Sequence, residues 1–249
     1  MDVLGDHHAH DQLHSLIPRE DLKLRMVGRH PTPAELLEQL PGRVRRCVDD
    51  APASPMLSSR SGMRTELSDG TLTIRAYEPG IELAVFEAAA ESVREIGPSM
   101  RTWRDGATSE KAARHVAESI RAWQAGTWYD FAITRVGSPA FLGRVGLDWI
   151  RNDGTANVGY WVRTSQTGQG IATTAVRLLA QFAFEDLGLR RLELLIAVEN
   201  QASRRVAEKV GATLEGVLPA GSHGHRELQH QSYCFALTRG VGPAATQER

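Results

Sequence analysis

Hydrophobic and polar residues follow regular patterns from about residue 63 to residue 239. A period of two predicts strands, and apolar residues three or four positions apart predict helices. The expected strands cover residues 71–77, 128–136, 140–150, 156–163, 191–198, 213–218 and 231–238. The expected helices cover residues 81–96, 109–124, 171–187 and 201–210, and each is followed by a glycine within two residues. Helices and strands therefore interleave along the chain, which predicts a mixed α/β domain.

Residues 1–62 lack this periodicity. They contain five histidines, four of them between residues 7 and 14, and several prolines, and one short helix is expected at 33–40. Such a segment buries too little apolar surface to offset the entropy of ordering. We therefore expect a mostly disordered, dispensable extension at 1–62, a folded domain at 63–240 and a flexible tail at 241–249. Histidines in a flexible segment rarely form a defined metal site, so no metal is expected.

Composition narrows the class of protein. The chain has 249 residues, of which 41% are hydrophobic and 24% charged, and its formal net charge is −1. A charge so near zero gives no long-range attraction to nucleic acid or to a membrane surface, and neither is expected as a partner. Cys47 and Cys234 form no paired motif, and the chain lacks a signal-peptide pattern and an apolar run of ~20 residues. A cytoplasmic protein is expected, and the excess of Arg over Lys is typical of GC-rich bacteria.

A glycine-rich loop precedes the third expected helix. Residues 166–170 read QTGQG and connect the strand 156–163 to the helix 171–187. Glycines let successive backbone N–H groups converge, and the helix N-terminus adds partial positive charge, so a pyrophosphate would fit there. The loop has neither the Lys-Ser/Thr of a Walker motif nor the G-x-G-x-x-G spacing of dinucleotide-binding proteins. Taken alone, such a loop is more often a simple turn.

Further segments make the pattern specific. They are GYWV at 159–162, QTGQGIAT at 166–173, FAFEDLGLRRLEL at 182–194, ENQASRRVAEKVGATLEG at 199–216 and SYCFAL at 232–237. Together they resemble the GNAT superfamily of N-acetyltransferases, and most of all the branch of ribosomal-protein N-terminal acetyltransferases (the RimJ/RimL type). The resemblance extends over about 63–239 and is specific for acetyl-CoA binding, but not for the acceptor.

The resemblance implies a GNAT-type fold, a central and mostly antiparallel sheet flanked by helices. In that fold the strands 156–163 and 191–198 lie parallel and splay apart, and the pantetheine arm of acetyl-CoA lies between them. The arm satisfies backbone groups of a strand edge that has no strand partner. The cofactor-binding residues implied in this way are Tyr160, Trp161, Val162, Gln166, Thr167, Gly168, Gln169, Gly170, Ile171, Asn200 and Ser203. Asn200 is also a good helix N-cap in any protein, and the two roles are compatible.

The general base is less evident from the sequence. Many members of the family carry a carboxylate on the strand before GYW, but Asn157 stands there and cannot accept a proton. Asp148 or Glu193 could help through a water molecule. Glu193 could also be only an ion-pair partner of Arg190 or Arg191, and the sequence leaves both interpretations open.

The acid and the acceptor site are expected elsewhere. Other branches carry a tyrosine acid seven residues after the Asn, where this chain has Ala207. Ser203 is therefore the first candidate for the acid, with Tyr233 as the other. Trp103, in the loop 97–107, could contact the acceptor or simply cover the core.

The sequence therefore predicts transfer of acetyl from acetyl-CoA to a primary amine. A protein N-terminal α-amine is the favoured acceptor, because a site without an obvious base suits an amine of low pKa. An antibiotic or another small-molecule amine is the alternative acceptor, and a catalytically silent acyl-CoA-binding module is the alternative class. A monomer or a homodimer is expected.

Overall fold

The structure is a computed structural model, and it describes residues 62–221, 228 and 230–239. The expected helix at 33–40, most of the extension at 1–62 and the tail at 241–249 lie outside the described residues. Every strand and helix expected between 71 and 238 is found, with ends shifted by a few residues.

Within the described residues the sheet has eight strands. They are β1 (Glu66–Ser68), β2 (Leu72–Ala76), β3 (Tyr129–Arg135), β4 (Gly143–Asp148), β5 (Thr155–Val162), β6 (Arg191–Ala197), β7 (Thr213–Leu218) and β8 (Ser232–Thr238). The helices are α4 (Glu82–Ile96), α5 (Ser109–Ala125), α6 (Ile171–Glu185) and α7 (Gln201–Lys209), with 3-10 turns η1 (Arg101–Trp103) and η2 (Thr164–Gln166). The periodicity missed β1, because a three-residue strand is too short to show alternation.

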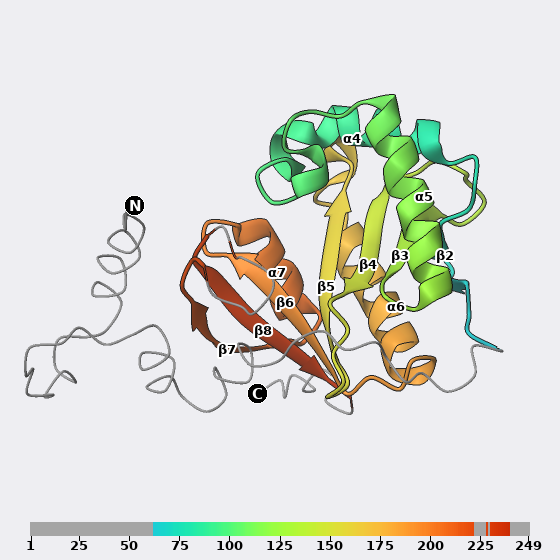
Figure 1. Ribbon diagram of the computed structural model, residues 1–249. Coiled ribbons are helices and arrows are strands. Elements are labelled where there is room, and N and C mark those ends of the chain that lie inside the picture. The colour runs from blue at the N-terminus through green and yellow to red at the C-terminus, as the bar shows by residue number, and fades with distance from the viewer. Residues whose placement is uncertain (1–61, 222–227, 229, 240–249) are drawn as a thin grey trace, which may run out of the picture.

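The strand order is β1-β2-β3-β4-β5-β6-β8-β7, and every neighbouring pair except β5 and β6 is antiparallel. The β5–β6 pair is parallel and joined at three positions only, the last being Asn157 with Glu193. Beyond it the strands diverge, and Figure 1 shows them meeting at one end and spreading toward the other. The expected fold, a mostly antiparallel sheet with one splayed parallel pair, is confirmed.

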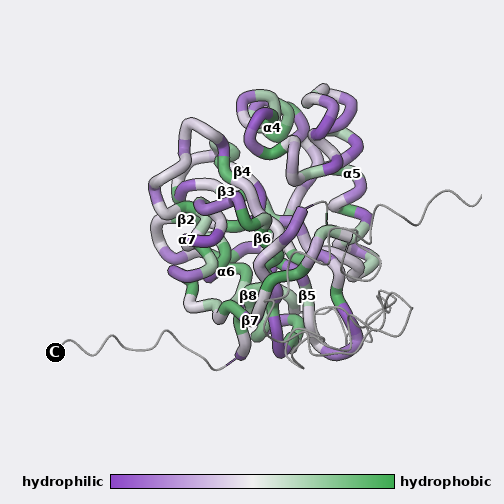
Figure 2. The backbone as a smooth tube through the Cα atoms, turned by 90° about the vertical axis from the view of Figure 1, so that its left-hand side faces the viewer, coloured by the Kyte–Doolittle hydropathy of each residue, from purple (hydrophilic) through white to green (hydrophobic). Residues whose placement is uncertain are grey.

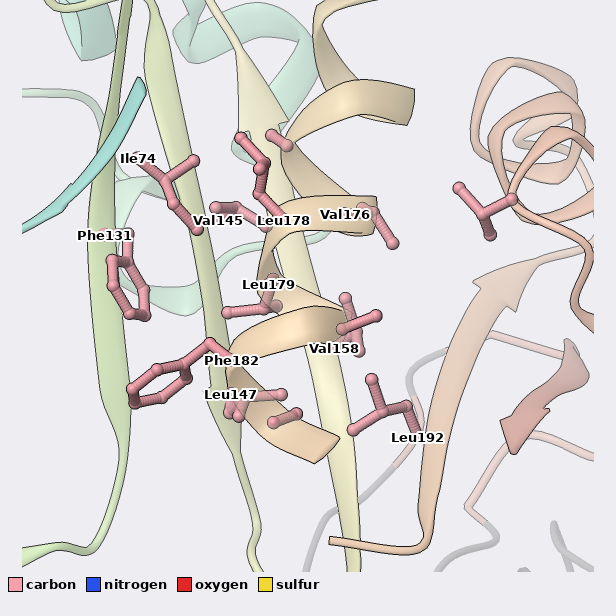
Figure 3. Close-up of a cluster of buried hydrophobic side chains, with 14 of the residues drawn as sticks. Ile74, Phe131, Val145, Leu147, Val158, Val176, Leu178, Leu179, Phe182 and Leu192 are labelled. Carbon is pink, nitrogen blue, oxygen red and sulfur yellow. The ribbon is translucent and has the colours of Figure 1, made fainter. Parts of the chain in front are cut away.

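Helices cover both faces of the sheet. The apolar side of α6 packs on one face, where Leu179 and Phe182 lie against Val145, Leu147 and other buried side chains of the strands (Figure 3). Figure 2 shows hydrophobic positions concentrated along the strands and α6. Burial of this apolar surface is the main stabilising contribution to the fold.

The opposite face is covered by α4 and α5 over β2 to β5. A second buried cluster joins these helices to the sheet, and it contains Tyr77, Trp103, Phe141 and Trp161. Along β5, Trp161 points to this second face, whereas Val158 points to α6. Alternate residues of β5 therefore serve two different surroundings.

The start of the described chain is fixed to the end of α6. The backbone N–H of Arg64 donates to Asp186 Oδ1 at 3.0 Å, and its guanidinium also bonds to Asp186 and Glu185. Among the residues that the structure describes, no helix is long and apolar enough to cross a membrane.

Candidate active site

The gap between β5 and β6 is the central feature of the site. Beyond Asn157 and Glu193 the two strands no longer pair, so the edge of β5 at 158–162 faces β6 without a strand partner. Backbone groups left in this way need a partner, which water or an extended ligand can provide. The residues predicted to bind the pantetheine arm, Tyr160, Trp161 and Val162, lie along this edge.

The glycine-rich loop follows directly at the open end of β5. Gly168 and Gly170 have φ of +77° and +80°, the left-handed region that favours glycine. Gly170 is the N-cap of α6 and provides no side-chain acceptor, so the first N–H groups of the helix remain available for an anion. A Cβ on either glycine would meet no atom within 4 Å, so open space lies beside the loop.

The loop is held in place by α4. Glu91 accepts a hydrogen bond from the backbone N–H of Ser165 at 2.8 Å and also pairs with Arg163. The Ser92 hydroxyl accepts from the N–H of Thr164 at 3.0 Å. The hydrogen bond from Ser165 and the charge of Arg163 lower the pKa of Glu91. Sequence reasoning missed Glu91 as a support for the loop, since nothing in the local pattern links it to a segment 72 residues away.

The start of helix α7 brings Asn200 and Ser203 together, across the gap from Tyr160 of β5. The side chain of Asn200 accepts from the N–H of Ser203 at 3.0 Å, so Asn200 is indeed an N-cap. The hydroxyl of Tyr160 donates to the backbone carbonyl of Ser203 at 3.3 Å. Burial raises the pKa of Tyr160 to about 12, so this hydroxyl is protonated and acts as the donor at neutral pH. Tyr233 lies beside α7 with the guanidinium of Arg204 5.3 Å from its ring centre.

Glu193 has a different environment. Its carboxylate is fully buried and receives two hydrogen bonds from Arg151, at 3.0 and 3.1 Å, and further ones from Arg191. This arrangement supports the ion-pair interpretation, with Arg151 and Arg191 as the partners. Arg190 instead donates to the backbone carbonyl of Asp153. Arginine side chains occupy both carboxylate oxygens of Glu193, and we propose no base role for it.

A second polar network lies on the sheet face that α4 and α5 cover. Asn157 donates from Nδ2 to Asp148 Oδ1 at 2.7 Å, across the β4–β5 register. Next to them, Arg144 donates from Nε to the buried Asp130 at 2.6 Å, and Ser119 donates to the other Asp130 oxygen at 2.6 Å. Burial alone would raise the pKa of Asp130, but the charges of Arg144 and His115 and the hydrogen bonds from Ser119 and Arg144 together outweigh burial, and the pKa is lowered.

Two paired glycines make room for this network. Gly146 on β4 lies opposite Gly159 on β5, and the Arg144 guanidinium lies over both. A Cβ at Gly159 would come 2.8 Å from an Arg144 nitrogen. His115 of α5 adds a ring whose Nε2 lies 3.8 Å from Asp130, and burial lowers its pKa.

Trp103 does not reach the surface. It is fully buried in the second cluster, and its ring contacts His115 edge-on at 5.8 Å. This position matches the alternative in which Trp103 covers the core, and we propose no acceptor contact for it. Among the described residues, no group of His, Cys, Asp and Glu could hold a metal ion.

The geometry is that of a known family. Residues 71–213 match the acetyltransferase (GNAT) domain. The chain belongs to this family. The family resemblance of its motifs is thus confirmed by a match over more than half of its length.

Individual relatives agree with this assignment. The chain is 33% identical over 112 residues to the probable N-acetyltransferase YjcK of Bacillus subtilis, a match covering 44% of this chain and 62% of YjcK. It thus spans less than two thirds of that relative. RimL, a ribosomal L7/L12 alpha-N-protein acetyltransferase in complex with coenzyme A, superposes with a TM-score of 0.61 at 23% identity, over 71% of this chain and 97% of RimL. The microcin C7 self-immunity acetyltransferase MccE, in complex with acetyl-CoA and AMP, gives 0.61 at 20% identity, over 68% and 93%.

Proposed function

We propose that the protein transfers the acetyl group of acetyl-CoA to a primary amine, with a protein N-terminal α-amine as the acceptor. One observation carries this proposal: β5 and β6 separate after three residue pairs, directly beside a helix N-terminus whose cap is a left-handed glycine. An extended amide-bearing arm and a pyrophosphate are the two parts of CoA that such a gap and such a helix end would bind.

The cosubstrate contacts follow from this arrangement. The β5 edge from Tyr160 to Val162 would pair with the pantetheine amides. The N–H groups from Thr167 to Ile171 would hold the pyrophosphate, with Gly168 and Gly170 allowing the close approach and Gln166 and Gln169 flanking it. Asn200 and Ser203 would face the arm from α7, since one helical turn separates them.

An α-amine fits the site better than a lysine side chain. An α-amine has a pKa near ~8 and lysine near ~10.4, so the α-amine is deprotonated more easily by about 3 kcal/mol at neutral pH. RimL, which shares the fold, is described as an α-N-protein acetyltransferase, and this agrees with the proposal. Acetyl-CoA supplies the thioester. Ser203, with Tyr233 as the second candidate, would give a hydrogen bond or a proton to the departing sulfur.

The test is turnover with a defined acceptor panel. The purified protein is incubated with acetyl-CoA and, separately, peptides with free N-termini, the same peptides N-terminally blocked but carrying a lysine, and small amines including aminoglycosides. Thiol release gives the rate, and mass spectrometry locates the acetyl group. Acetylated α-amines support the proposal. Turnover of small amines alone would favour a small-molecule enzyme, and CoA binding without turnover of any amine would favour a silent binding module.

A further inference from the structure

We propose that Asp148 and Asn157 bind the acceptor amine on the sheet face opposite α6, and that the Asp148 carboxylate accepts the proton of the amine. This inference rests on the proposed function. Many members of the family carry a carboxylate where this chain has Asn157, and the inference gives the role of that carboxylate to Asp148 on β4.

The two residues lie where the gap begins. Asn157 is the last residue of β5 that pairs with β6, so it stands at the vertex of the two diverging strands. Asp148 is its register partner at the end of β4, and the two side chains bond to each other and so lie on the same face. An amine beside them would therefore be next to the point where a ligand can enter between the strands.

The amide of Asn157 is oriented by this hydrogen bond. Its Nδ2 faces the carboxylate of Asp148, which can only accept, so the amide oxygen must point away from Asp148. Asn157 is 5% exposed, and within the part of the chain that the structure describes its Oδ1 has no hydrogen-bond partner. A buried acceptor without a donor is costly, and its presence points to a donor that arrives with a ligand.

Asp148 and Asn157 together offer the acceptor groups that a primary ammonium needs. A primary ammonium offers three N–H donors and needs a negative charge nearby, whereas Asp148 and Asn157 offer a carboxylate and an amide oxygen. Asp148 is partly buried, so protons can still leave it for solvent. Trp149, the next residue, has φ of +54°, and no other described non-glycine residue has a positive φ. Strained backbone of this kind is often found beside functional groups.

Charged groups of both signs lie around Asp148. Arg144 on the same strand interacts with Asp148 and with Asp130 on β3, and Glu193 lies across from Asn157 on β6. His115 of α5 lies by Asp130. The charge of Arg144 is paired with Asp130. The charge of Glu193 is paired with Arg151 and Arg191. The charges around Asp148 are therefore close to balanced.

The proposed step balances as follows. The ammonium loses one proton to Asp148, and the freed lone pair of nitrogen forms the new bond to the acetyl carbon. The bond from that carbon to sulfur breaks, and its electron pair leaves with the sulfur. The nitrogen gives up a second proton, so that one proton ends on the CoA thiol and the one on Asp148 passes to water. The amide keeps one N–H.

Binding is the first test, because it does not depend on turnover. Calorimetry with CoA present would compare the best acceptor peptide of the panel with its N-acetylated form. Asp148→Asn and Asn157→Leu should each weaken the free-amine peptide by about 10- to 100-fold, since a hydrogen bond to a charged group is lost. Neither should change the affinity of the acetylated peptide or of CoA. Equal weakening of both peptides would overturn the inference.

Kinetics provide the second test. An analogue of the same peptide with an aminooxy group in place of the α-amine needs no deprotonation at neutral pH. Asp148→Asn should lower turnover of the amine about 10²-fold and that of the aminooxy peptide less than tenfold. The same loss for both acceptors, or no loss, would overturn the role of Asp148. Glu66→Gln, which removes an exposed carboxylate paired with Arg75 on the sheet edge, is the matched control and should leave all values unchanged. If the parent protein acetylates no amine, it is the proposed function that fails.

Discussion

The hydroxyl of Tyr160 donates a hydrogen bond to the backbone carbonyl of Ser203, 3.3 Å away, and so links β5 to α7 across the gap. The bond uses only the backbone of Ser203, whose N–H is in turn bound by Asn200. Among the described residues, no hydrogen bond of the Ser203 hydroxyl itself is seen. The side chain of Ser203 can therefore be changed without breaking either contact that positions it.

Ser203→Ala should lower turnover and leave the affinity for acetyl-CoA nearly unchanged. General-acid assistance contributes about 10²–10⁴-fold, and the lower end is expected because a thiol of pKa near ~8.5 leaves fairly well as a thiolate. Steady-state rates and calorimetry measure the two effects. Tyr160→Phe is the comparison, because it removes the link to α7 but keeps the Ser203 hydroxyl, and should destabilise the fold by about 1 kcal/mol. Parent-like turnover of Ser203→Ala would transfer the acid role to Tyr233 or water.

Gly170→Val should weaken CoA binding sharply while affecting dephosphorylated pantetheine fragments much less. A β-branched residue is strained at φ +80°, and the loop would move away from the conformation that binds an anion. Gly188→Val is the matched control: Gly188 has φ +66° at the other end of α6 and also has open space around it. It should lower stability similarly but keep CoA affinity. Equal weakening of CoA and pantetheine would show that the loop does not contact phosphate.

Glu193→Gln should lower stability but not the chemical rate. Loss of the charge removes the buried counter-ion of Arg151, which keeps only the partly exposed Asp153 at 3.7 Å, and breaking a buried pair costs about 3–5 kcal/mol. Gln retains an acceptor oxygen, so a decrease of roughly 3 kcal/mol in the free energy of unfolding is expected. Denaturant unfolding measures the change in stability. Turnover per folded molecule is compared between the variant and the parent protein at low temperature. A turnover loss of 10²-fold in a fully folded sample would restore Glu193 as a candidate base.

His115→Phe should flatten the dependence of stability on pH below neutrality. Burial keeps the folded-state pKa of His115 below its ordinary value of 6.5, so the unfolded chain binds a proton more readily. Stability of the parent should therefore fall as pH decreases from about 7 to about 5, a window above the titration of most carboxylates. Phe keeps the edge-on contacts with Tyr77 and Trp103 but cannot titrate. Parallel stability curves for parent and variant would contradict this account.

A chain shortened to begin at Met63 should keep its melting temperature and its affinity for acetyl-CoA, because it retains Arg64. One that begins at Glu66 loses the contacts of Arg64 with Asp186. Arg64 is 38% exposed, so solvent screening reduces the loss to about 1 kcal/mol, or roughly 2–4 °C at this size. Calorimetric scans of the two shortened chains test the boundary. A drop of several degrees already at Met63 would show that the preceding residues contribute to the fold.

Periodicity predicted the strands and helices because residues at regular spacing share one surrounding. In β5, for example, Val158 and Trp161 face different clusters on the two sides of the sheet. It could not predict pairs formed by the register of distant segments. Arg151 lies in a turn 42 residues before Glu193, and only the sheet brings them together. For the same reason the sequence suggested Asp148 without showing that Asn157 holds it.

The loop residues were harder to predict for another reason. Trp103 is an aromatic residue between polar ones, and such a pattern does not distinguish a side chain exposed to ligand from one folded inward. Its burial depends on how η1 packs on α4 and α5, which is a property of the whole domain. The glycines of the QTGQG loop were predictable, because a left-handed backbone has few other solutions.

The three residue pairs between β5 and β6 are the only strand pairing, within the described residues, that joins β1 to β5 with β6, β8 and β7. A ligand lying in the gap would act as the missing strand, so the sheet would be complete only in the complex. Ligand binding would therefore also reduce the motion of β6, β8 and β7 relative to the other strands. Release of that ligand would break these backbone contacts on both strands. The rate of product release would then depend on how easily β5 and β6 move apart, as well as on contacts at the reacting atoms.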